Sequence, residues 1–427
     1  VPTLSELLRT RILKTARPSL KVKFAEENNL EFIIDDNIAL TYEDLVDCAN
    51  NGAHSGKLEI PQVGILEFSK KFFSGIANSC DLEILPDGLK SNPNKEEENS
   101  PSKRIFEGIE DFLDAVMASS SKIYIYTSGT TGRPKRALHT IKTLTRNVKI
   151  GGKHAKDKWG FCYAPSHMAG IQVLLQAFFN KNTCVNLFGK TRSQIYSEIE
   201  KRAITHISAT PTFYRLLLPC VKIFPNVERA TFGGERSSKQ LYESISKIFP
   251  NAKITNVYAS TEVGALLASE ADIFKIPPGL KGLVKIDNGE LAIHKSLLAL
   301  SDDTPLSGDF YKTGDAVEFA DADKMSFRFT GRIGNFINVG GYKVNPEEVE
   351  DAIKSLDGVR EAIVFGKPNS LLGNILCAEI SIIPAAKVSE SDIRTSLLKL
   401  LPQFKIPRII SFTDSIRLTR TGKIKRV

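Results

Sequence analysis

The chain has 427 residues, of which 42% are hydrophobic and 25% charged, and its formal net charge is +8 at pH 7. This length exceeds that of one ordinary domain and predicts two or three, with a composition typical of globular rather than disordered or fibrous proteins. The lysines are spread along the sequence, without a dense run or interleaved aromatic residues. We therefore expect a basic, solvated surface and no nucleic acid among the partners.

The sequence contains no candidate membrane span. Its longest apolar runs, such as residues 171–179, fall short of the about 18 residues that a spanning helix needs. The first residues lack the basic-then-apolar order of a signal peptide, and the apolar residues between Leu4 and Leu13 recur at helical spacing, which predicts a short amphipathic helix. The six cysteines form no C-x-x-C pair, which argues against a zinc site or a disulfide scaffold. We expect a cytoplasmic protein.

Helices and strands alternate along most of the chain. Residues 86–104 are polar and interrupted by prolines, which predicts a surface loop. Strands are predicted at 121–127, 159–165, 182–188, 205–210, 229–234 and 253–259. Helices are predicted at 141–150, 169–179, 193–202, 211–224 and 239–249. This order predicts an α/β fold with a mainly parallel sheet covered by helices.

The last third of the chain has a different pattern. Short strands and turns follow Gly282, and a compact α+β unit ends the sequence. In this unit, helices at 346–356 and 389–401 and strands at 359–366 and 375–383 are predicted. We place a domain boundary at the glycine-flanked turn, with a large N-terminal domain at 1–333 and a small, mobile C-terminal domain at 334–427.

Residues 126–135, YTSGTTGRPK, directly follow a predicted strand and combine two glycines, four serine or threonine hydroxyls and a lysine. Exposed backbone N–H groups and hydroxyls in such a turn bind anions, with Lys135 as counter-charge. The turn is not a Walker A loop, because Arg-Pro separates Gly132 from Lys135. Most serine- and glycine-rich turns have only a structural role, so the context of this turn decides whether it is interpreted as an anion-binding site. Similar turns follow three later strands, after Thr210, Phe232 and Ala259, where parallel sheets bind ligands.

YTSGTTGRPK closely resembles the phosphate-binding signature of the adenylate-forming superfamily, which includes acyl-CoA synthetases, aryl-CoA ligases, adenylation domains and luciferases. Arg136 replaces the usual glycine after the lysine. Further segments resemble family elements and occur in the family order: PSHMAG (165–170), FGGE (232–235), YASTEVG (258–264), YKTGD (311–315), GRIGNFINVGGYKVNPEEVE (331–350) and RTGKIKR (420–426). The resemblance covers the chain from Tyr126 onward and looks closest to small aryl-CoA and o-succinylbenzoate–CoA ligases.

The resemblance implies that a carboxylate attacks the α-phosphate of ATP, which gives an acyl-adenylate and pyrophosphate, and that a thiol then takes the acyl group. ATP, Mg²⁺ and coenzyme A are the expected small molecules. In such a reaction the protein mainly positions groups and neutralises charge. The residues expected to bind ATP or AMP are Thr127, Ser128, Gly129, Thr130, Thr131, Gly132, Lys135, Gly233, Gly234, Glu235, Tyr258, Ala259, Ser260, Asp315 and Arg332. Those expected in catalysis are His167 beside the acid, Thr261 at the α-phosphate, Glu262 as the Mg²⁺ ligand, and Lys423.

Three of these assignments carry specific roles by resemblance. Tyr258 is expected against the adenine, and Asp315 is expected to accept from both ribose hydroxyls with Arg332 nearby. Lys423, on the C-terminal domain, is expected to reach the carboxylate and the α-phosphate during adenylation only. The variant Lys423→Ala should then abolish adenylate formation but spare thioester formation from a supplied acyl-adenylate.

Three glycines are expected to serve the second half of the reaction. Gly334 occupies the hinge position, where glycine permits a large φ/ψ change but lacks the polar anchoring that Asp or Lys gives in many relatives. Gly340 and Gly341 open the loop that should face the thiol, where they would let a pantetheine arm approach the backbone.

The acid itself is only partly constrained. Amino-acid-activating members carry an aspartate around the position of His167, whereas residues 161–172 contain no acidic residue. We therefore expect an acid without an α-amine, either aryl or alkyl. Arg215 could pair with a second carboxylate, although an arginine on a helix surface is the favoured interpretation.

Three functions remain open at this point. The first is an acid–CoA ligase, and the second is an enzyme that loads the pantetheine of an acyl carrier protein. The third, a non-catalytic nucleotide-binding homologue, is disfavoured because Lys135, Glu262, Asp315, Arg332 and Lys423 are all present. Only 125 residues precede Tyr126, fewer than is usual in the family, so part of the acid-pocket wall could be missing or could come from a partner subunit; a homodimer is left open.

Overall fold

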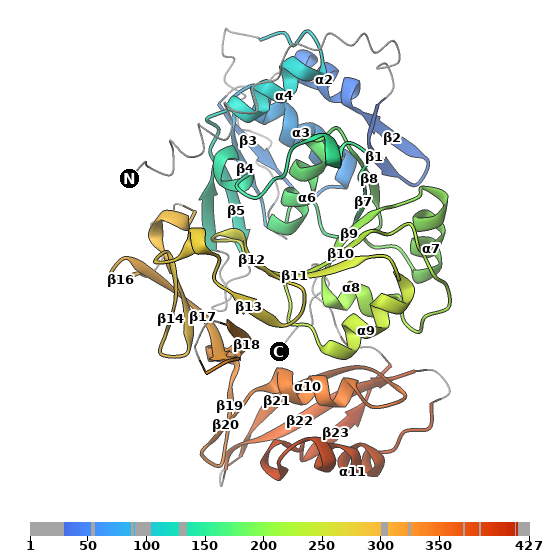
Figure 1. Cartoon of the computed structure of the whole chain (residues 1–427), viewed down its shortest axis with the longest axis vertical. Coiled ribbons are helices and arrows are strands. Elements are labelled where there is room, and N and C mark those ends of the chain that lie inside the picture. Colours follow the sequence, from blue (N-terminus) through green and yellow to red (C-terminus); the bar gives the residue numbers. More distant parts are fainter. Residues whose placement is uncertain are drawn as a thin grey trace.

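The computed structural model of the chain describes residues 30–52, 56–86, 89, 104–127, 135–299, 306–322, 326–369, 372–383, 386–414 and 416. These residues form a large N-terminal domain with a smaller C-terminal domain below it in the view of Figure 1, which confirms the predicted α/β fold class. No helix among them is long and apolar enough to cross a membrane. The predicted amphipathic helix near the start, and most of the polar stretch 86–104, lie outside the described residues.

The largest sheet, sheet A, has eight strands in the order β12-β11-β10-β9-β7-β8-β1-β2. The strands are β1 (Glu31–Asp35), β2 (Ile38–Thr41), β7 (Lys158–Phe161), β8 (Thr183–Asn186), β9 (His206–Ala209), β10 (Arg229–Gly233), β11 (Lys253–Ser260) and β12 (Gly264–Ser269). All neighbours from β11 to β1 are parallel, and the two edge strands are antiparallel to their partners. The predicted, mainly parallel sheet is therefore confirmed, and the carboxyl ends of β9, β10 and β11 lie side by side.

The strand before the expected phosphate-binding loop lies in a second sheet. Sheet B has four strands in the order β3 (Lys57–Ile60), β4 (Asp81–Ile84), β5 (Ile123–Thr127) and β6 (Lys135–His139). The first three are parallel, and β6 returns antiparallel to β5. The sequence predicted one series of strands from 121 to 259, but β5 and β7–β11 belong to different sheets because apolar periodicity does not determine which strands pair.

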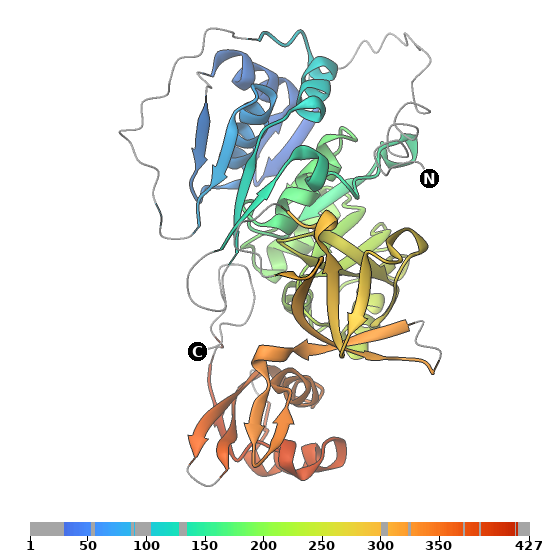
Figure 2. The same cartoon turned by 90° about the vertical axis from the view of Figure 1, so that its left-hand side faces the viewer.

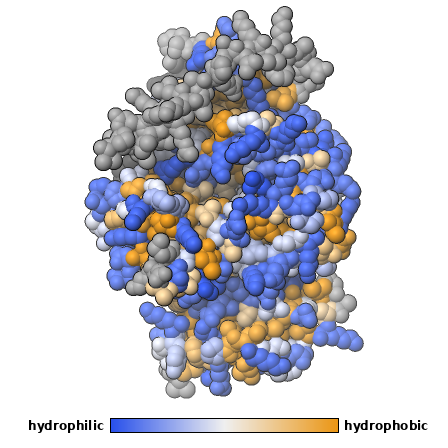
Figure 3. All heavy atoms as spheres, in the orientation of Figure 1, coloured by the Kyte–Doolittle hydropathy of each residue, from blue (hydrophilic) through white to orange (hydrophobic). Residues whose placement is uncertain are grey.

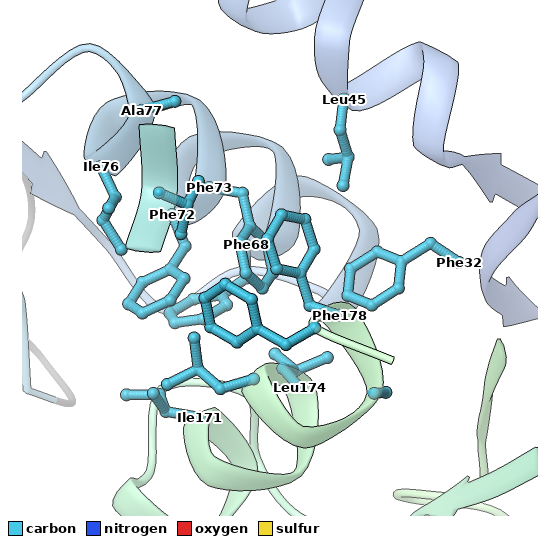
Figure 4. Packing of buried hydrophobic residues seen from close by; sticks show 14 of the residues in the cluster. Phe32, Leu45, Phe68, Phe72, Phe73, Ile76, Ala77, Ile171, Leu174 and Phe178 are labelled. Atoms are coloured by element: carbon cyan, nitrogen blue, oxygen red, sulfur yellow. The ribbon is translucent and has the colours of Figure 1, made fainter. Parts of the chain in front are cut away.

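The hydrophobic core of the N-terminal domain fills the space between sheets A and B. Helix α3 (Ile65–Ala77) contacts β1 of sheet A as well as β3 and β4 of sheet B, and α6 (Met168–Phe178) contacts β7 and β8. Phenylalanine rings from these helices meet in the close-up of Figure 4, where the ring centroids of Phe73 and Phe178 lie 4.1 Å apart. Phe32 from β1 packs on both. Helices α2 (Tyr42–Asn51) and α4 (Ile109–Ala118) extend this core.

Three further helices accompany the central strands of sheet A. They are α7 (Arg192–Lys201), α8 (Pro211–Leu216) and α9 (Lys239–Ile248). A second group of buried side chains joins these helices to the sheet, and in it the rings of Tyr214 and Phe232 stack at 4.0 Å between centroids. The helices therefore hold the strand ends that carry the expected nucleotide-binding turns.

A third sheet, sheet C, follows sheet A and leads to the C-terminal domain. Its strands are β13 (Ile273–Lys275), β14 (Val284–Asp287), β15 (Glu290–His294), β16 (Leu306–Ser307), β17 (Phe310–Phe319) and β18 (Ser326–Arg332). The short strands predicted after Gly282 are found in β14–β16, whereas β17 and β18 are longer, with 10 and 7 residues. A single 3₁₀ turn, Ile333–Asn335, then separates β18 from the next domain.

The C-terminal domain is an α+β unit with its own core. Its strands are β19 (Ile337–Val339), β20 (Tyr342–Val344), β21 (Val359–Asn369), β22 (Gly373–Ile382) and β23 (Ile409–Phe412), and its helices are α10 (Pro346–Lys354) and α11 (Glu390–Leu400). Both helices pack on one face of the sheet through buried residues such as Val349 and Leu397. Figure 2 shows this domain joined to the rest of the molecule below sheet C.

Two predicted helices are much shorter than expected. The pattern at 141–150 gives only α5 (Ile141–Leu144), and in the segment after it the side chains of Arg146 and Asn147 donate to the carbonyls of Leu297 and Ala265. The pattern at 211–224 gives only α8, because Pro219 has no N–H for a helical hydrogen bond and restricts the residue before it.

Candidate functional site

A cavity of about 360 Å³ lies between the two domains, within the range of about 300–1,000 Å³ typical of small-molecule sites. Its walls come from the ends of β10 and β11, from β17 and β18, and from α10 of the C-terminal domain. In Figure 3 hydrophilic residues cover much of the molecular face where the two domains meet. Six residues that the sequence predicts at the nucleotide line the cavity: Gly234, Glu235, Tyr258, Ala259, Asp315 and Arg332.

Asp315 is the centre of the polar contacts in this cavity. One carboxylate oxygen lies 2.7 Å from Nε of Arg332, and the other accepts a hydrogen bond of 2.7 Å from the hydroxyl of Tyr258. Arg332 also donates to the carbonyl of Thr313, 3.1 Å away. The ring of Tyr258 stacks on Phe329, with centroids 4.6 Å apart. These contacts fix the carboxylate at the cavity wall before any ligand arrives.

The protonation of this cluster follows from its burial. Burial raises the pKa of Asp315 above its ordinary value, although the nearby charge of Arg332 and the hydrogen bond from Tyr258 oppose the rise. Burial, followed by the charge of Asp315, raises the pKa of Tyr258 well above 10. Tyr258 is therefore a hydrogen-bond donor at neutral pH, and Asp315 needs its two donors to stay ionised.

Glu235, two residues after the end of β10, holds the start of α8. Its Oε2 accepts from both the backbone N–H and the hydroxyl of Thr212, at 3.1 and 2.7 Å. Its Oε1 is buried and has no protein partner among the described residues. An unsatisfied buried carboxylate oxygen is costly, so this atom is suited to accept from a polar ligand in the cavity that Glu235 lines.

Thr261 and Glu262 lie in the turn between β11 and β12 and do not line this cavity. The buried imidazole of His139, on β6, has Nε2 2.8 Å from the carbonyl oxygen of Thr261, and the N–H of Ala299 donates to the carbonyl of Glu262 at 2.6 Å. Burial lowers the pKa of His139 to about 4, so the ring is neutral at pH 7 and Nε2–H donates. Sequence reasoning did not select His139.

Glu262 fits the role expected for a magnesium ligand. Its negative charge contributes to the raised pKa values of Asp315 and Tyr311, after burial in both cases, so it adds to the negative potential beside the cavity. No group of three or more His, Cys, Asp or Glu side chains among the described residues could hold a metal by itself. Mg²⁺ is commonly bound by one or two carboxylates together with substrate phosphates and water, and one carboxylate at this place meets that requirement.

His167 immediately precedes helix α6 and likewise does not line the cavity. Its neighbour Ser166 donates to Oε1 of Gln62 at 2.7 Å, which ties the PSHMAG segment to the loop after β3. Gly233 and Ser260 are the last residues of β10 and β11 and also lie outside the cavity lining. The structure thus places these residues at strand and helix ends, as predicted, but not all at one cavity.

The phosphate-binding loop and the late lysine fall outside the described residues. Residues 128–134, which include Ser128, Gly129, Thr130, Thr131 and Gly132, are not described, and neither is Lys423. The loop begins at Thr127, the last residue of β5, and ends at Lys135, the first of β6, and these two residues are backbone partners across the sheet. Its two ends are therefore held side by side.

The expected hinge and thiol-facing glycines lie away from the cavity lining. Gly334 is in the 3₁₀ turn that follows β18. Gly340 and Gly341 form the turn between β19 and β20 with φ of +57° and +88°. A two-residue hairpin turn with positive φ at both positions favours glycine, so these two residues are explained by local geometry in the described arrangement.

Sequence reasoning missed two further residues that line the cavity. Asn256 and Arg236 line the cavity beside Tyr258 and Glu235. The signal for Asn256 was available, because residues two apart on a strand share a face and Asn256 precedes Tyr258 by two on β11. Arg236 follows the FGGE motif directly, but nothing in the motif marks it.

Arg215 is neither on the solvent surface nor available as a separate cation. It lines the cavity, and its Nη1 lies 3.8 Å from Oε2 of Glu361 in the C-terminal domain. Its side chain is only 17% exposed. The favoured interpretation from the sequence, an arginine on a helix surface, is wrong because the C-terminal domain covers this part of α8.

Two family models match the chain. The model of the AMP-binding enzyme matches residues 81–284, and the model of the AMP-binding enzyme C-terminal domain matches residues 348–423. The chain belongs to the AMP-binding enzyme family. The two matches fall on the large and the small domain, and between them lie β15–β20 with Asp315 and Arg332.

Among curated relatives of this AMP-binding enzyme, oxalate–CoA ligase of Saccharomyces cerevisiae is 27% identical over 72% of the chain and 62% of the relative. 4-Hydroxybutyrate–CoA ligase 1 of Metallosphaera sedula is 27% identical over 71% of the chain and 61% of the relative. The chain thus spans about three fifths of these relatives' length. The fold is similar to that of o-succinylbenzoate–CoA synthetase from Bacillus subtilis in complex with ATP and magnesium ion, with a TM-score of 0.66 and 17% identity over 93% of this chain and 95% of the other.

Proposed function

We propose that this protein activates a carboxylic acid with ATP, forming an acyl-adenylate and pyrophosphate, and then passes the acyl group to coenzyme A. The observation that carries the proposal is the cavity in which Asp315, Tyr258 and Arg332 meet. A fixed carboxylate at the wall of a polar cavity is suited to accept from two neighbouring ribose hydroxyls. Family membership and two CoA ligases among the relatives support the same activity.

The remaining roles in the adenylation step follow the family motifs. Ser128, Thr130, Thr131 and Lys135 would hold the phosphates that leave as pyrophosphate. Thr261 would contact the α-phosphate, and Glu262 would hold Mg²⁺, which when bound neutralises phosphate charge. Lys423 would stabilise the attacking carboxylate and the α-phosphate, because a positive charge placed where negative charge develops lowers the barrier.

The substrate that we propose is an acid without an α-amine. Residues 161–172 contain no acidic group to pair with an ammonium. Oxalate and 4-hydroxybutyrate, the acids named for the two relatives, are small acids that lack an amine. Arg215 does not support a second carboxylate on the substrate, because Glu361 already pairs with it.

Coenzyme A is favoured over a carrier protein as the thiol, because both relatives above are CoA ligases. We place the boundary between the catalytic domains at residues 333 and 334. Gly334 would be the hinge about which the small domain turns to bring Gly340 and Gly341 toward the thiol. The 3₁₀ turn that contains Gly334 is a short connection with an open side, since a Cβ at Gly334 would meet nothing within 4 Å.

Acid-dependent ATP–pyrophosphate exchange tests the proposal. A panel of aryl, dicarboxylic, alkyl and amino acids should give exchange with one class of acid, and the active acids should then yield a CoA thioester. Lys423→Ala is the matched variant, because it should lose exchange and still form thioester from supplied acyl-adenylate. Folded protein that gives no exchange with any acid would contradict the proposal and favour a nucleotide-binding homologue. Thioester formed only on a carrier protein would replace CoA as the acceptor.

A further inference from the structure

The turn that carries Thr261 and Glu262 is held by side chains from a distant part of the chain. Strand β11 ends at Ser260 and β12 begins at Gly264, so the two residues lie in a tight connection at the edge of sheet A. The Nε2 of His139 lies 2.8 Å from the carbonyl oxygen of Thr261, and Nδ2 of Asn147 donates to the carbonyl of Ala265. Both donors follow the phosphate-binding loop in sequence.

His139 is the last residue of β6, the strand that starts at Lys135. At about 3.4 Å per residue the four steps from Lys135 to His139 span roughly 14 Å. The strand is paired along its length with β5, from Lys135 opposite Thr127 to His139 opposite Ile123. His139 thus occupies a fixed place relative to both ends of the phosphate-binding loop.

The imidazole of His139 is held from both sides. Its side chain is buried, with 2% of the residue exposed. Its Nδ1 lies 3.2 Å from the hydroxyl of Thr143, which is itself fixed in the capping box at the start of α5. Because a carbonyl oxygen only accepts, Nε2 carries the proton and donates to Thr261, and Nδ1 shares the Thr143 hydroxyl proton with the carbonyl of Thr140, which lies 3.0 Å from that hydroxyl. The ring has one orientation that satisfies both contacts.

This contact joins two sheets that share no strand pairing among the described residues. Strand β6 belongs to sheet B, whereas β11 and β12 belong to sheet A. Side chains, rather than a backbone ladder, must therefore set the distance between the loop after β5 and the turn after β11.

We propose that His139 is a positioning residue that links Thr261, and with it Glu262, to the strand beginning at Lys135. This inference rests on the proposed function, in which these residues act on the same triphosphate. Misplacing a catalytic group by about 1 Å can reduce a rate about 100-fold. A contact that sets the spacing between two halves of a phosphate site therefore affects catalysis without touching substrate.

The test compares His139→Phe with His139→Gln. Phenylalanine keeps the volume but leaves the Thr261 carbonyl without its donor, whereas glutamine offers an amide N–H near the position of Nε2. We expect His139→Phe to lower kcat for ATP–pyrophosphate exchange by about 10- to 100-fold, and to weaken binding of Mg²⁺–ATP more than binding of ATP in the presence of EDTA. His139→Gln should restore most of both losses.

A readout independent of activity is hydrogen–deuterium exchange of the peptide that spans residues 258–268. His139→Phe should speed exchange there and leave the peptide over β10 unchanged. His206→Phe, the same substitution at another buried histidine on β9, is the control for general destabilisation and should not speed exchange at 258–268. Equal exchange in wild type and His139→Phe, or no rescue by glutamine, would overturn the inference. If wild type is inactive with every acid, the proposed function fails, and the deuterium exchange still decides whether His139 holds the turn.

Discussion

Glu83 on β4 joins β3, β4 and β5 of sheet B, and β5 leads into the proposed phosphate-binding loop. One of its carboxylate oxygens accepts from the hydroxyl of Tyr126 on β5, and the other pairs with Lys57 on β3. Burial alone would raise the pKa of Glu83, but the hydrogen bonds from Lys57 and Tyr126 outweigh it and hold this pKa below the ordinary 4.5. A depressed carboxyl pKa means that the ionised group stabilises the fold.

The sign of this effect predicts the pH dependence of the variant Glu83→Gln. The stabilisation by Glu83 is fully present above pH 4.5, the ordinary pKa, and is lost as pH falls through the lower pKa of the folded state. At pH 7 we expect the variant to lose about 1–3 kcal/mol in free energy of unfolding, with the difference shrinking below pH 4.5. Urea denaturation at a series of pH values measures it. Glu243→Gln, at an exposed pair with Lys239, should have little effect, and a difference that grows on acidification would contradict the assignment.

Asp315 gives a second prediction at this scale, now for ligand binding. Asp315→Asn keeps the shape but removes the charge that faces Arg332 and Tyr258. The ribose hydroxyls of ATP would then lose a hydrogen bond to a charged acceptor, which contributes about 1.5–3 kcal/mol. The KM for ATP in pyrophosphate exchange should therefore rise roughly 10- to 100-fold. Asp309→Asn, at an exposed pair with Lys295, is the matched control and should leave this KM unchanged. An unaltered KM in Asp315→Asn would remove Asp315 from the nucleotide site.

The secondary-structure elements show what the sequence could and could not predict. Strands and helices with a strong apolar pattern, such as β11 and α9, are found within a few residues of their predicted bounds. The failures are local: 141–150 and 211–224 have helical spacing, but the first is helical only at Ile141–Leu144, and the lack of an N–H at Pro219 ends the second early. The family motifs, in their order along the chain, pointed to the strand ends that line the cavity between the domains. The partner of Thr261 at His139, and that of Arg215 at Glu361, depend on how separate sheets and domains pack, which no spacing encodes.

Helix α6 offers a test of what holds sheets A and B together. Phe178 stacks on Phe73 of α3 and also contacts the rings of Phe32, Tyr42 and Phe112. Figure 4 labels Phe178 with Phe73 and Phe32. Phe178→Ala should cost about 3–5 kcal/mol in free energy of unfolding, because the removed ring leaves a cavity that rigid neighbours cannot fill. Chemical denaturation measures this loss. Leu398→Ala on α11, where the side chain is 57% exposed, should change stability by less than about 0.5 kcal/mol. Equal losses in the two variants would contradict this account of the core.

Across the whole molecule, alternating charges connect the two domains around the cavity. Arg236 of the large domain lies 3.8 Å from Asp351 on α10, and Arg215 lies 3.8 Å from Glu361 on β21. Lys354 stands between the two carboxylates, 3.4 Å from Asp351 and 3.7 Å from Glu361. This row of five charges favours the arrangement in which α10 faces the nucleotide cavity. In the proposed rotation of the small domain about Gly334, both arginines would move away from these partners.

The double variant Arg215→Gln/Arg236→Gln should therefore shift the population of domain arrangements. Partly exposed ion pairs contribute about 0.2–1 kcal/mol each, so losing two should change the population ratio roughly 2- to 30-fold. Fluorescence energy transfer between dyes on Glu243→Cys in α9 and Leu398→Cys in α11 measures it, with the exposed Cys220 replaced by serine. High salt should shift the wild type in the same direction, because screening weakens such pairs, and should affect the double variant less. Lys253→Gln, at an exposed pair with Glu270 within the large domain, is the control. Identical distance distributions in wild type and double variant at every salt concentration would show that the charges do not set the arrangement.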